Sequence, residues 1–241
     1  MFVPELRKVL RVLGTWAVLL LRIRVAALIA LSAVATACSD SRNPFASFET
    51  RCAKLPPTNF EVVTVPFTFE RDDSQSIAAL TAKSGSALAT HRTSGLTTAT
   101  FGQNTDIQLN VVDDRRGSRA CGTPHVHIEL SMQPVTVYVA SELAAQPCQH
   151  DVTLSHEMKH VAVFREALEV AARDLARDFP TAIGVQLRSA TNPGELQQRF
   201  VVSVRDYLAR FMRDRERMLD ESQAAVDSPE EYARVSTACA S

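Results

Sequence analysis

The hydrophobic pattern of this sequence changes its period near Cys148. Before this residue, apolar side chains alternate with polar ones, most clearly in HVHIELSMQPVTVYVA (125–140), and such alternation predicts strands. After it, apolar residues recur every three or four positions, which predicts an amphipathic helix that is capped by Asp151 or Thr153 and runs to about Asp178. Strands that precede helices in this way favour an α+β fold.

Further elements are expected on both sides of this change. The strand signals are β-branched and aromatic runs, and the helix signals are capping residues followed by apolar spacing. Before the change of period, we expect a strand over 60–70 with Pro66 at an edge or bulge, a short helix capped by Asp73 or Ser74 and ended by Gly85, and strands within 93–102 and 104–117. After it, we expect a second long helix from Asn192-Pro193-Gly194-Glu195 to about Ala224 and a short last helix from Ser228-Pro229.

The first 37 residues differ in charge from the remainder of the chain. They hold five basic residues and one acid, and residues 38–241 hold 21 basic and 26 acidic residues, so the formal charge of −1 averages a basic leader and an acidic remainder. Arg22 and Arg24 precede an uncharged run over 25–37, which is typical of a signal peptide. We expect a signal peptide over 1–37, a tether over 38–57, a single domain over 58–241, and no nucleic-acid partner.

Cys38 follows the small residues Ala35-Thr36-Ala37, a pattern that resembles a bacterial lipobox. This predicts a lipid anchor at Cys38 and an exported protein of the periplasm or cell envelope, such as an outer-membrane lipoprotein. The alternative is an uncleaved anchor over 9–37, but Arg22 and Arg24 would then lie near the middle of the bilayer, where charges are costly.

The remaining four cysteines are Cys52, Cys121, Cys148 and Cys239. An even number in an oxidising compartment predicts two disulfides, for which three pairings exist. The favoured pairing joins Cys121 to Cys148, which bracket one strand segment, and Cys52 to Cys239, near the two ends. Unpaired buried thiols are the alternative.

The sequence His156-Glu157-Met158-Lys159-His160 is an HExxH motif within the predicted helix. Residues four apart lie on one face of a helix, so His156 and His160 are expected to bind one Zn²⁺ ion. Glu157 points about 100° away from His156, beside the metal, where it is expected to act as the general base. The alternatives are a solvated helix face or a structural zinc site.

Catalytic zinc needs a third protein ligand, and the familiar spacings for one are not met. A metzincin would have Gly at 163 and His at 166, where this chain has Val163 and Glu166; without the glycine, the helix should continue and turn Glu166 away. A gluzincin would have its glutamate where Phe179 and Pro180 stand. The third ligand is therefore expected near the end of the second long helix, among the candidates Asp220, Glu221 and Asp227.

Four segments in order, RTSGLTTATF, CGTPHVHIELSM, the HExxH helix and QAAVD, resemble the bacterial family called domain of unknown function 922, described as secreted zinc-dependent proteases. Gln223 and Asp227 match its late Gln-x-x-Tyr-Asp segment, although Val226 replaces the Tyr and SPEEYARVSTAC replaces the following Thr and His-Gly. The resemblance implies a zincin-like α+β domain, in which a mostly antiparallel sheet precedes the HExxH helix and a second long helix. It also implies Asp227 as the third ligand.

Two further sites are considered on the strand at 125–140. His125 and His127 share one face and could bind a second metal ion with His150, or could simply be solvated. If this strand borders the active site, Glu129 and its neighbours could contact an extended peptide by β-augmentation.

The sequence therefore predicts an exported zinc-dependent metallopeptidase that acts on a peptide or protein substrate. A non-enzymatic envelope lipoprotein with a structural or vestigial zinc site is the main alternative. A peptidoglycan amidase is a weaker one.

Overall fold

The computed structural model describes residues 46–85, 92–114, 116–184 and 188–240, and the chain divides into two units, 1–54 and 55–241. The predicted signal peptide and Cys38 lie outside the described residues. Within the first unit, α2 (Phe48–Ala53) forms in the segment expected to be a tether, and Ser47 caps it. Among the described residues, no helix combines the length and the apolar character that crossing a membrane requires.

The longer sheet of the second unit has β5 at its centre. One edge of β5 pairs with β4 in an antiparallel register, and its other edge pairs with β1 in parallel and, nearer the start of β5, with β7 in antiparallel. β7 lies between the two long helices, in a segment for which no strand was predicted. The strands are β1 (Asn59–Thr64), β4 (Phe101–Asp113), β5 (Ala120–Met132) and β7 (Arg188–Ala190).

A second, smaller sheet follows the order β2–β6–β3. Here β2 (Glu70–Asp72) is parallel and β3 (Gly95–Thr98) is antiparallel to β6 (Thr136–Val139). The family resemblance implied a mostly antiparallel sheet. Both sheets are mixed: the β4–β5, β5–β7 and β3–β6 pairings are antiparallel, and the β1–β5 and β2–β6 pairings are parallel. Two predicted strands are also divided, 60–70 into β1 and β2 and 125–140 into β5 and β6. Each break contains a proline, which has no N–H to donate to a neighbouring strand.

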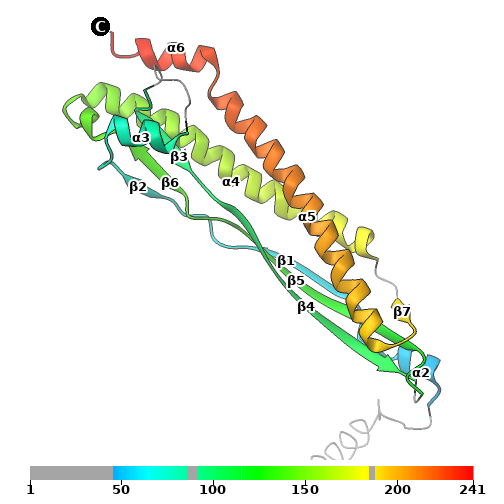
Figure 1. Ribbon diagram of the computed structural model, residues 1–241. Coiled ribbons are helices and arrows are strands. Elements are labelled where there is room, and N and C mark those ends of the chain that lie inside the picture. Colours follow the sequence, from blue (N-terminus) through cyan, green and yellow to red (C-terminus); the bar gives the residue numbers. More distant parts are fainter. Residues whose placement is uncertain (1–45, 86–91, 115, 185–187, 241) are drawn as a thin grey trace, which may run out of the picture. The chain divides into compact units, whose positions relative to one another are not determined.

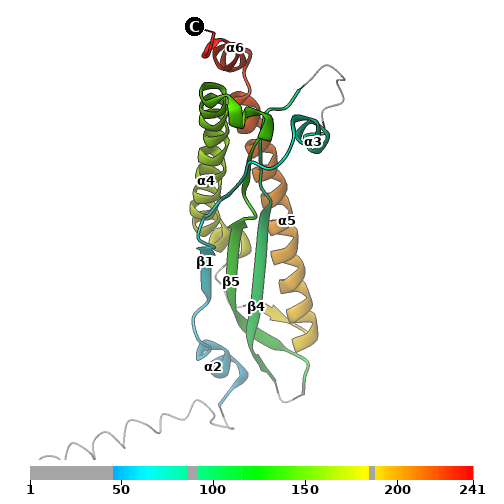
Figure 2. The ribbon, with the colours of Figure 1, turned by 90° about the vertical axis from the view of Figure 1, so that its left-hand side faces the viewer.

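Two long antiparallel helices, α4 (Pro147–Ile183) and α5 (Pro193–Val226), cover one face of the longer sheet (Figures 1 and 2). The start of α5 is as predicted, since the Asn192 side chain accepts a hydrogen bond from the Glu195 N–H at 2.9 Å. α4 is longer than predicted at both ends. It begins with a proline at a first-turn position, where a missing N–H costs nothing, and it continues past Pro180 to bury Ile183 in the core.

The core lies between this sheet face and the two helices. The predicted alternation along β5 is confirmed, because the side chains on its inward face are at most 2% exposed. Aromatic rings join the layers: Phe179 of α4 makes edge contacts with Phe60 of β1 and Tyr207 of α5. The buried residues of β5 and α5 in this core include Val126, Ile128, Leu130, Met132, Phe200, Val204 and Leu208.

Shorter helices lie at the end of the unit that carries the smaller sheet (Figure 1). The short helix α3 (Ile77–Lys83) is capped by Ser76, not by Asp73 or Ser74. The Asp73 carboxylate instead pairs with Arg71 at 2.6 Å, which removes it from the helix start. η1 (Ser141–Ala145) precedes α4, and α6 (Pro229–Thr237) follows α5 with its predicted serine cap. None of the side chains of α6 is buried.

A disulfide between Cys148 and Cys239 joins the first turn of α4 to the residues just after α6. Both favoured pairings, Cys121 with Cys148 and Cys52 with Cys239, are therefore wrong, although Cys52 and Cys121 are also disulfide-bonded and the chain contains two disulfides as predicted. The antiparallel return of α5 along α4 brings the end of the chain back to the start of α4, which the local sequence does not reveal.

Replacing Cys148 and Cys239 by Ser is expected to lower the free energy of unfolding by about 2–5 kcal/mol. The physical reason is that the bond closes a long loop, with 91 residues of sequence separation, and so restricts the unfolded chain. Urea titration of the two proteins measures the difference, and a double Ala variant controls for the serine hydroxyls. Unchanged unfolding midpoints in both variants would contradict the prediction.

Candidate metal centre

His156 and His160 lie one turn apart on the inner face of α4, as their spacing predicts. Both residues are buried, and their Nε2 atoms are 3.3 Å apart. The two rings meet edge to face with centroids 4.9 Å apart, so each ring limits the rotation of the other. The helix therefore presents two imidazole nitrogens at one point.

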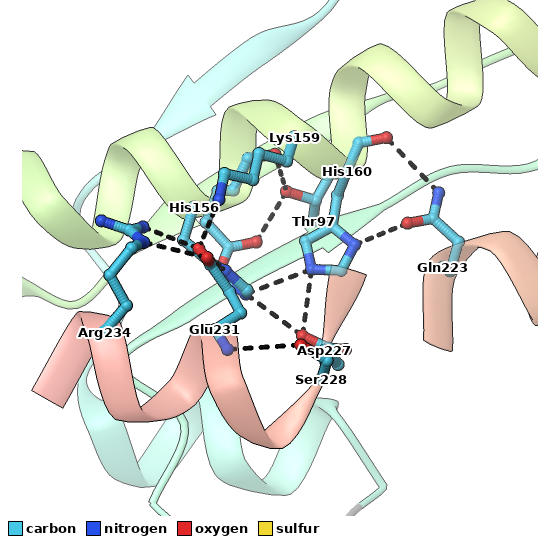
Figure 3. Close-up of polar contacts among 10 residues, drawn as sticks. Thr97, His156, Lys159, His160, Gln223, Asp227, Ser228, Glu231 and Arg234 are labelled. Carbon is cyan, nitrogen blue, oxygen red and sulfur yellow. Dashed lines mark hydrogen bonds and ion pairs between the residues drawn. The ribbon is translucent and has the colours of Figure 1, made fainter. Parts of the chain in front are cut away.

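Asp227, the residue that ends α5, completes this group (Figure 3). Its Oδ1 lies 3.1 Å from Nε2 of His156 and 3.3 Å from Nε2 of His160. The other two candidates, Asp220 and Glu221, are exposed on α5, and Glu221 pairs with Arg217 at 3.2 Å. Of the three acids, the structure brings Asp227 to the histidines, and the resulting group could hold a metal ion.

The spacing of these three atoms fits a tetrahedral metal site. Zinc bonds imidazole nitrogen and carboxylate oxygen at roughly 2.0–2.2 Å, and in a tetrahedron this separates neighbouring ligand atoms by about 3.3–3.6 Å. The observed separations, 3.1, 3.3 and 3.3 Å, lie at or slightly below this range, so the three atoms are close enough together to form one face of such a tetrahedron. Imidazole and carboxylate donors suit zinc and other first-row divalent metals, so the donor set alone leaves the identity of the metal open.

The Nδ1 atoms of both histidines face hydrogen-bonding partners on the side away from this triangle. Nδ1 of His160 lies 2.5 Å from Oε1 of Gln223, whose Nε2 donates to the His160 carbonyl oxygen at 3.4 Å. Nδ1 of His156 lies 3.2 Å from Oε1 of Glu231 in α6. Arg234 and Lys159 hold the pKa of Glu231 well below its usual range. Glu231 was not among the site residues expected from the sequence.

Glu157 is buried beside the two histidines on the same helix. Thr97 of β3 donates a hydrogen bond from its hydroxyl to Oε2 of Glu157 at 2.8 Å, which fixes the carboxylate. Burial raises the pKa of Glu157 to about 7, although the hydrogen bond from Thr97 acts in the opposite direction. The structure thus places a carboxyl group with one constrained oxygen next to the predicted ligands.

Gly95 of β3 allows this carboxylate to sit where it does. A Cβ atom at residue 95 would lie 2.4 Å from Oε1 of Glu157 and 2.6 Å from Cγ2 of Thr153. Only a residue without a side chain therefore fits at this point of the strand. Gly95 and Thr97 were missed as site residues, although both lie in the segment RTSGLTTATF that contributed to the family resemblance.

Gly95→Ala is expected to lower the free energy of unfolding by about 1–3 kcal/mol, because the added methyl group overlaps buried atoms on α4. Chemical denaturation measures the change. Gly194→Ala is the matched control, since a Cβ atom there meets only the Asn192 side chain at 3.4 Å, an ordinary contact. Equal stability of Gly95→Ala and wild type would refute the prediction.

The candidate metal centre opens into a cavity of about 470 Å³. One wall is β3 with the residues before it, another is the HExxH turn of α4, and the end of α5 and α6 form the third. The Asp227 side chain is 40% exposed, so the triangle is accessible from this cavity. Tyr232 of α6 also lines it, with its ring centroid 6.0 Å from that of His156. The cavity has the volume of a small-ligand or peptide side-chain site.

Comparison of the chain with models of known protein families, with curated proteins and with solved structures gives no match. The family resemblance and the zincin-like fold therefore stay predictions. The function must be inferred from the arrangement of the residues themselves.

The second metal site considered at His125, His127 and His150 is not formed. Nδ1 of His125 contacts the Asn59 amide at 3.1 Å, and Nδ1 of His127 contacts Glu61 at 3.1 Å. His150, at the start of α4, contacts the carboxylates of Asp73 at 3.5 Å and Asp151 at 3.2 Å. Among the described residues, the three histidines form no metal-binding group.

The suggested role of Glu129 in peptide binding is also wrong, because β5 has no free edge there. Residues 125–130 of β5 pair with β1 on one edge and with β4 on the other. The strand that borders the cavity is β3, which forms the edge of the smaller sheet. The predicted position of Glu166 is confirmed, since α4 continues and Glu166 lines a separate cavity with Arg215 and Met218.

Proposed function

We propose that this chain is an exported zinc-dependent peptidase. The observation that carries the proposal is the position of a buried glutamate, Glu157, beside a three-atom metal-binding face that opens into a cavity. A structural zinc site is normally closed by four protein ligands, whereas a catalytic site has three and leaves one position open. His156, His160 and Asp227 supply three donors, and their accessible side supports catalysis over a structural role.

The residues divide the chemistry of amide hydrolysis between them. His156, His160 and Asp227 would hold the metal ion, which when bound acts as a Lewis acid and lowers the pKa of a coordinated water toward about 7. Oε2 of Glu157 accepts the hydrogen bond from Thr97, which leaves Oε1 to take a proton from the attacking water. The same carboxyl group then returns the proton to the leaving amine. Thr97 keeps Glu157 oriented through both transfers.

An extended peptide is the substrate that the cavity wall favours. β3 is the edge strand of the smaller sheet, and among the described residues no other strand pairs with its outer side; its residues Gly95, Leu96 and Thr97 line the cavity. Pairing along β3 would run the peptide past Glu157, because Thr97 already contacts this residue. A protein or peptide in extended conformation therefore fits better than a compact small molecule.

Export is supported by the cysteines. Two disulfides are compatible with an oxidising compartment such as the periplasm or the cell envelope. Lipidation at Cys38 remains part of the proposal, and mass spectrometry of the protein extracted from membranes tests it.

Zinc content and cleavage of an unfolded protein test the proposed function together. The purified protein is expected to bind about one zinc ion per chain and to cleave reduced, carboxymethylated casein, with activity lost to a chelator and restored by zinc. Absence of bound zinc would overturn the proposal. Zinc binding without cleavage of casein or a peptide library would support the non-enzymatic alternative, and release of stem peptides from peptidoglycan would indicate an amidase.

A further inference from the structure

Glu231 contacts His156 on the side of the ring that faces away from the metal-binding triangle. Oε1 of Glu231 lies 3.2 Å from Nδ1, while Nε2 of the same ring lies 3.1 Å from Oδ1 of Asp227. A neutral imidazole carries one N–H, and a nitrogen that binds a metal ion carries none. Both ring nitrogens of His156 face a carboxylate, but Nε2 and Asp227 belong to the metal-binding group, so the N–H of a metal-bound His156 lies at Nδ1, opposite Glu231. We propose that Glu231 is a positioning residue that holds the His156 N–H at Nδ1 and leaves the lone pair of Nε2 for the metal ion. This inference rests on the proposed zinc site.

Glu231 is itself held from two directions. Its Oε1 lies 2.7 Å from Nζ of Lys159, and Arg234 contacts Oε1 at 2.6 Å and Oε2 at 2.9 Å (Figure 3). The Glu231 side chain is only 12% exposed, so these contacts are partly shielded from solvent. A carboxylate with both oxygens engaged has little freedom to turn away from His156, which is what orienting an imidazole ring requires.

Asp227, a candidate metal ligand, and Glu231, the proposed positioning residue, lie only four residues apart in the sequence. Ser228 caps α6 by accepting the Glu231 N–H at 3.2 Å, which fixes the first turn directly after Asp227. One segment thus supplies Asp227, a candidate ligand, and Glu231, which contacts Nδ1 of the candidate ligand His156. Lys159, which lies between the two histidines on α4, binds the same carboxylate. The first turn of α6 therefore docks on the HExxH turn through Glu231.

Gln223 offers an internal comparison, because it contacts Nδ1 of His160 as Glu231 contacts Nδ1 of His156. The partner of His160 is a neutral amide, whereas the partner of His156 is a carboxylate bound by two cations. A negatively charged partner makes the ligating nitrogen a stronger donor than a neutral partner does. We therefore expect the charge of Glu231, in addition to its hydrogen bond, to increase metal affinity.

The test is the zinc dissociation constant of the purified protein, measured by competition with a chromophoric chelator. Glu231→Ala is expected to weaken zinc binding about 10–100-fold, and Glu231→Gln less, because the amide oxygen still accepts the N–H of His156. With Co²⁺ in place of zinc, the visible absorption bands of Glu231→Ala should shift, since a freely turning His156 changes the ligand field.

Glu230→Ala is the matched control, because Glu230 is the neighbouring acid in the first turn of α6, is exposed, and lies outside the metal-binding group. Its zinc affinity should stay close to that of wild type. The inference is overturned if Glu231→Ala binds zinc as wild type does, or if Glu230→Ala loses as much affinity as Glu231→Ala. A wild-type protein that binds no zinc overturns this inference together with the proposed function, whereas one that binds zinc but cleaves nothing overturns the proposed function alone.

Discussion

Glu157→Gln is expected to abolish peptide hydrolysis while leaving the metal in place. The glutamine amide oxygen can still accept the hydrogen bond from Thr97, so the local packing should be preserved. A neutral amide cannot accept the proton of the attacking water, and the loss of a general base typically lowers the rate by about 10²–10⁴-fold. The ratio kcat/KM for a fluorogenic peptide, measured with the zinc content of the same sample, gives both readouts.

Glu166→Gln is the control for this experiment, because Glu166 lies on the same helix but lines a different cavity. It should hydrolyse the peptide at the wild-type rate. Wild-type activity in Glu157→Gln would remove Glu157 from the mechanism. Loss of zinc from this variant would show that the carboxylate contributes to binding the metal, which the proposed division of roles excludes.

Asp227→Ala is expected to weaken zinc binding more than about 100-fold, which exceeds the usual cost of losing an outer hydrogen-bonding partner. The substitution removes the one oxygen donor of the triangle and leaves two imidazoles on one turn of α4. Two histidines seldom retain zinc without a third protein ligand. Competition with a chelator measures the affinity, and hydrolysis should fall in parallel because the metal is lost.

Asp220→Ala and Glu221→Ala provide matched controls on the same helix. Both side chains are exposed and stand outside the metal-binding group, so zinc affinity should not change. If Asp227→Ala kept the affinity of wild type, the third ligand would have to be a different residue. Reduced affinity in either control would reopen the choice among the three acids.

The parts of the fold that depend on local patterns were predicted well. The apolar spacing after Cys148 indicated α4, and within this helix the HExxH motif placed His156 and His160 on one buried face. The Asn192 and Ser228 caps correctly marked the starts of α5 and α6, because capping depends on residues within one turn.

The parts that were missed depend on how distant segments meet. His156 and Asp227 are 71 residues apart, and their approach depends on the lengths and crossing of two helices. Spacing alone therefore left three acids as candidates. The contacts of Gly95 and Glu231 with the HExxH turn arise in the same way, from the packing of β3 and α6 on α4. The pairing of Cys148 with Cys239 has this cause as well.

Because the three candidate ligands come from α4 and the end of α5, metal supply would become a determinant of folded-state stability. A metal ion that bridges the HExxH turn and the end of α5 binds fully only to a chain whose helices are already packed, so binding shifts the folding equilibrium by mass action. Free metal at 100 times its dissociation constant would add about 2.7 kcal/mol to the free energy of unfolding. The thermal midpoint would then rise with metal concentration, and the apo chain would be the form that proteases remove first.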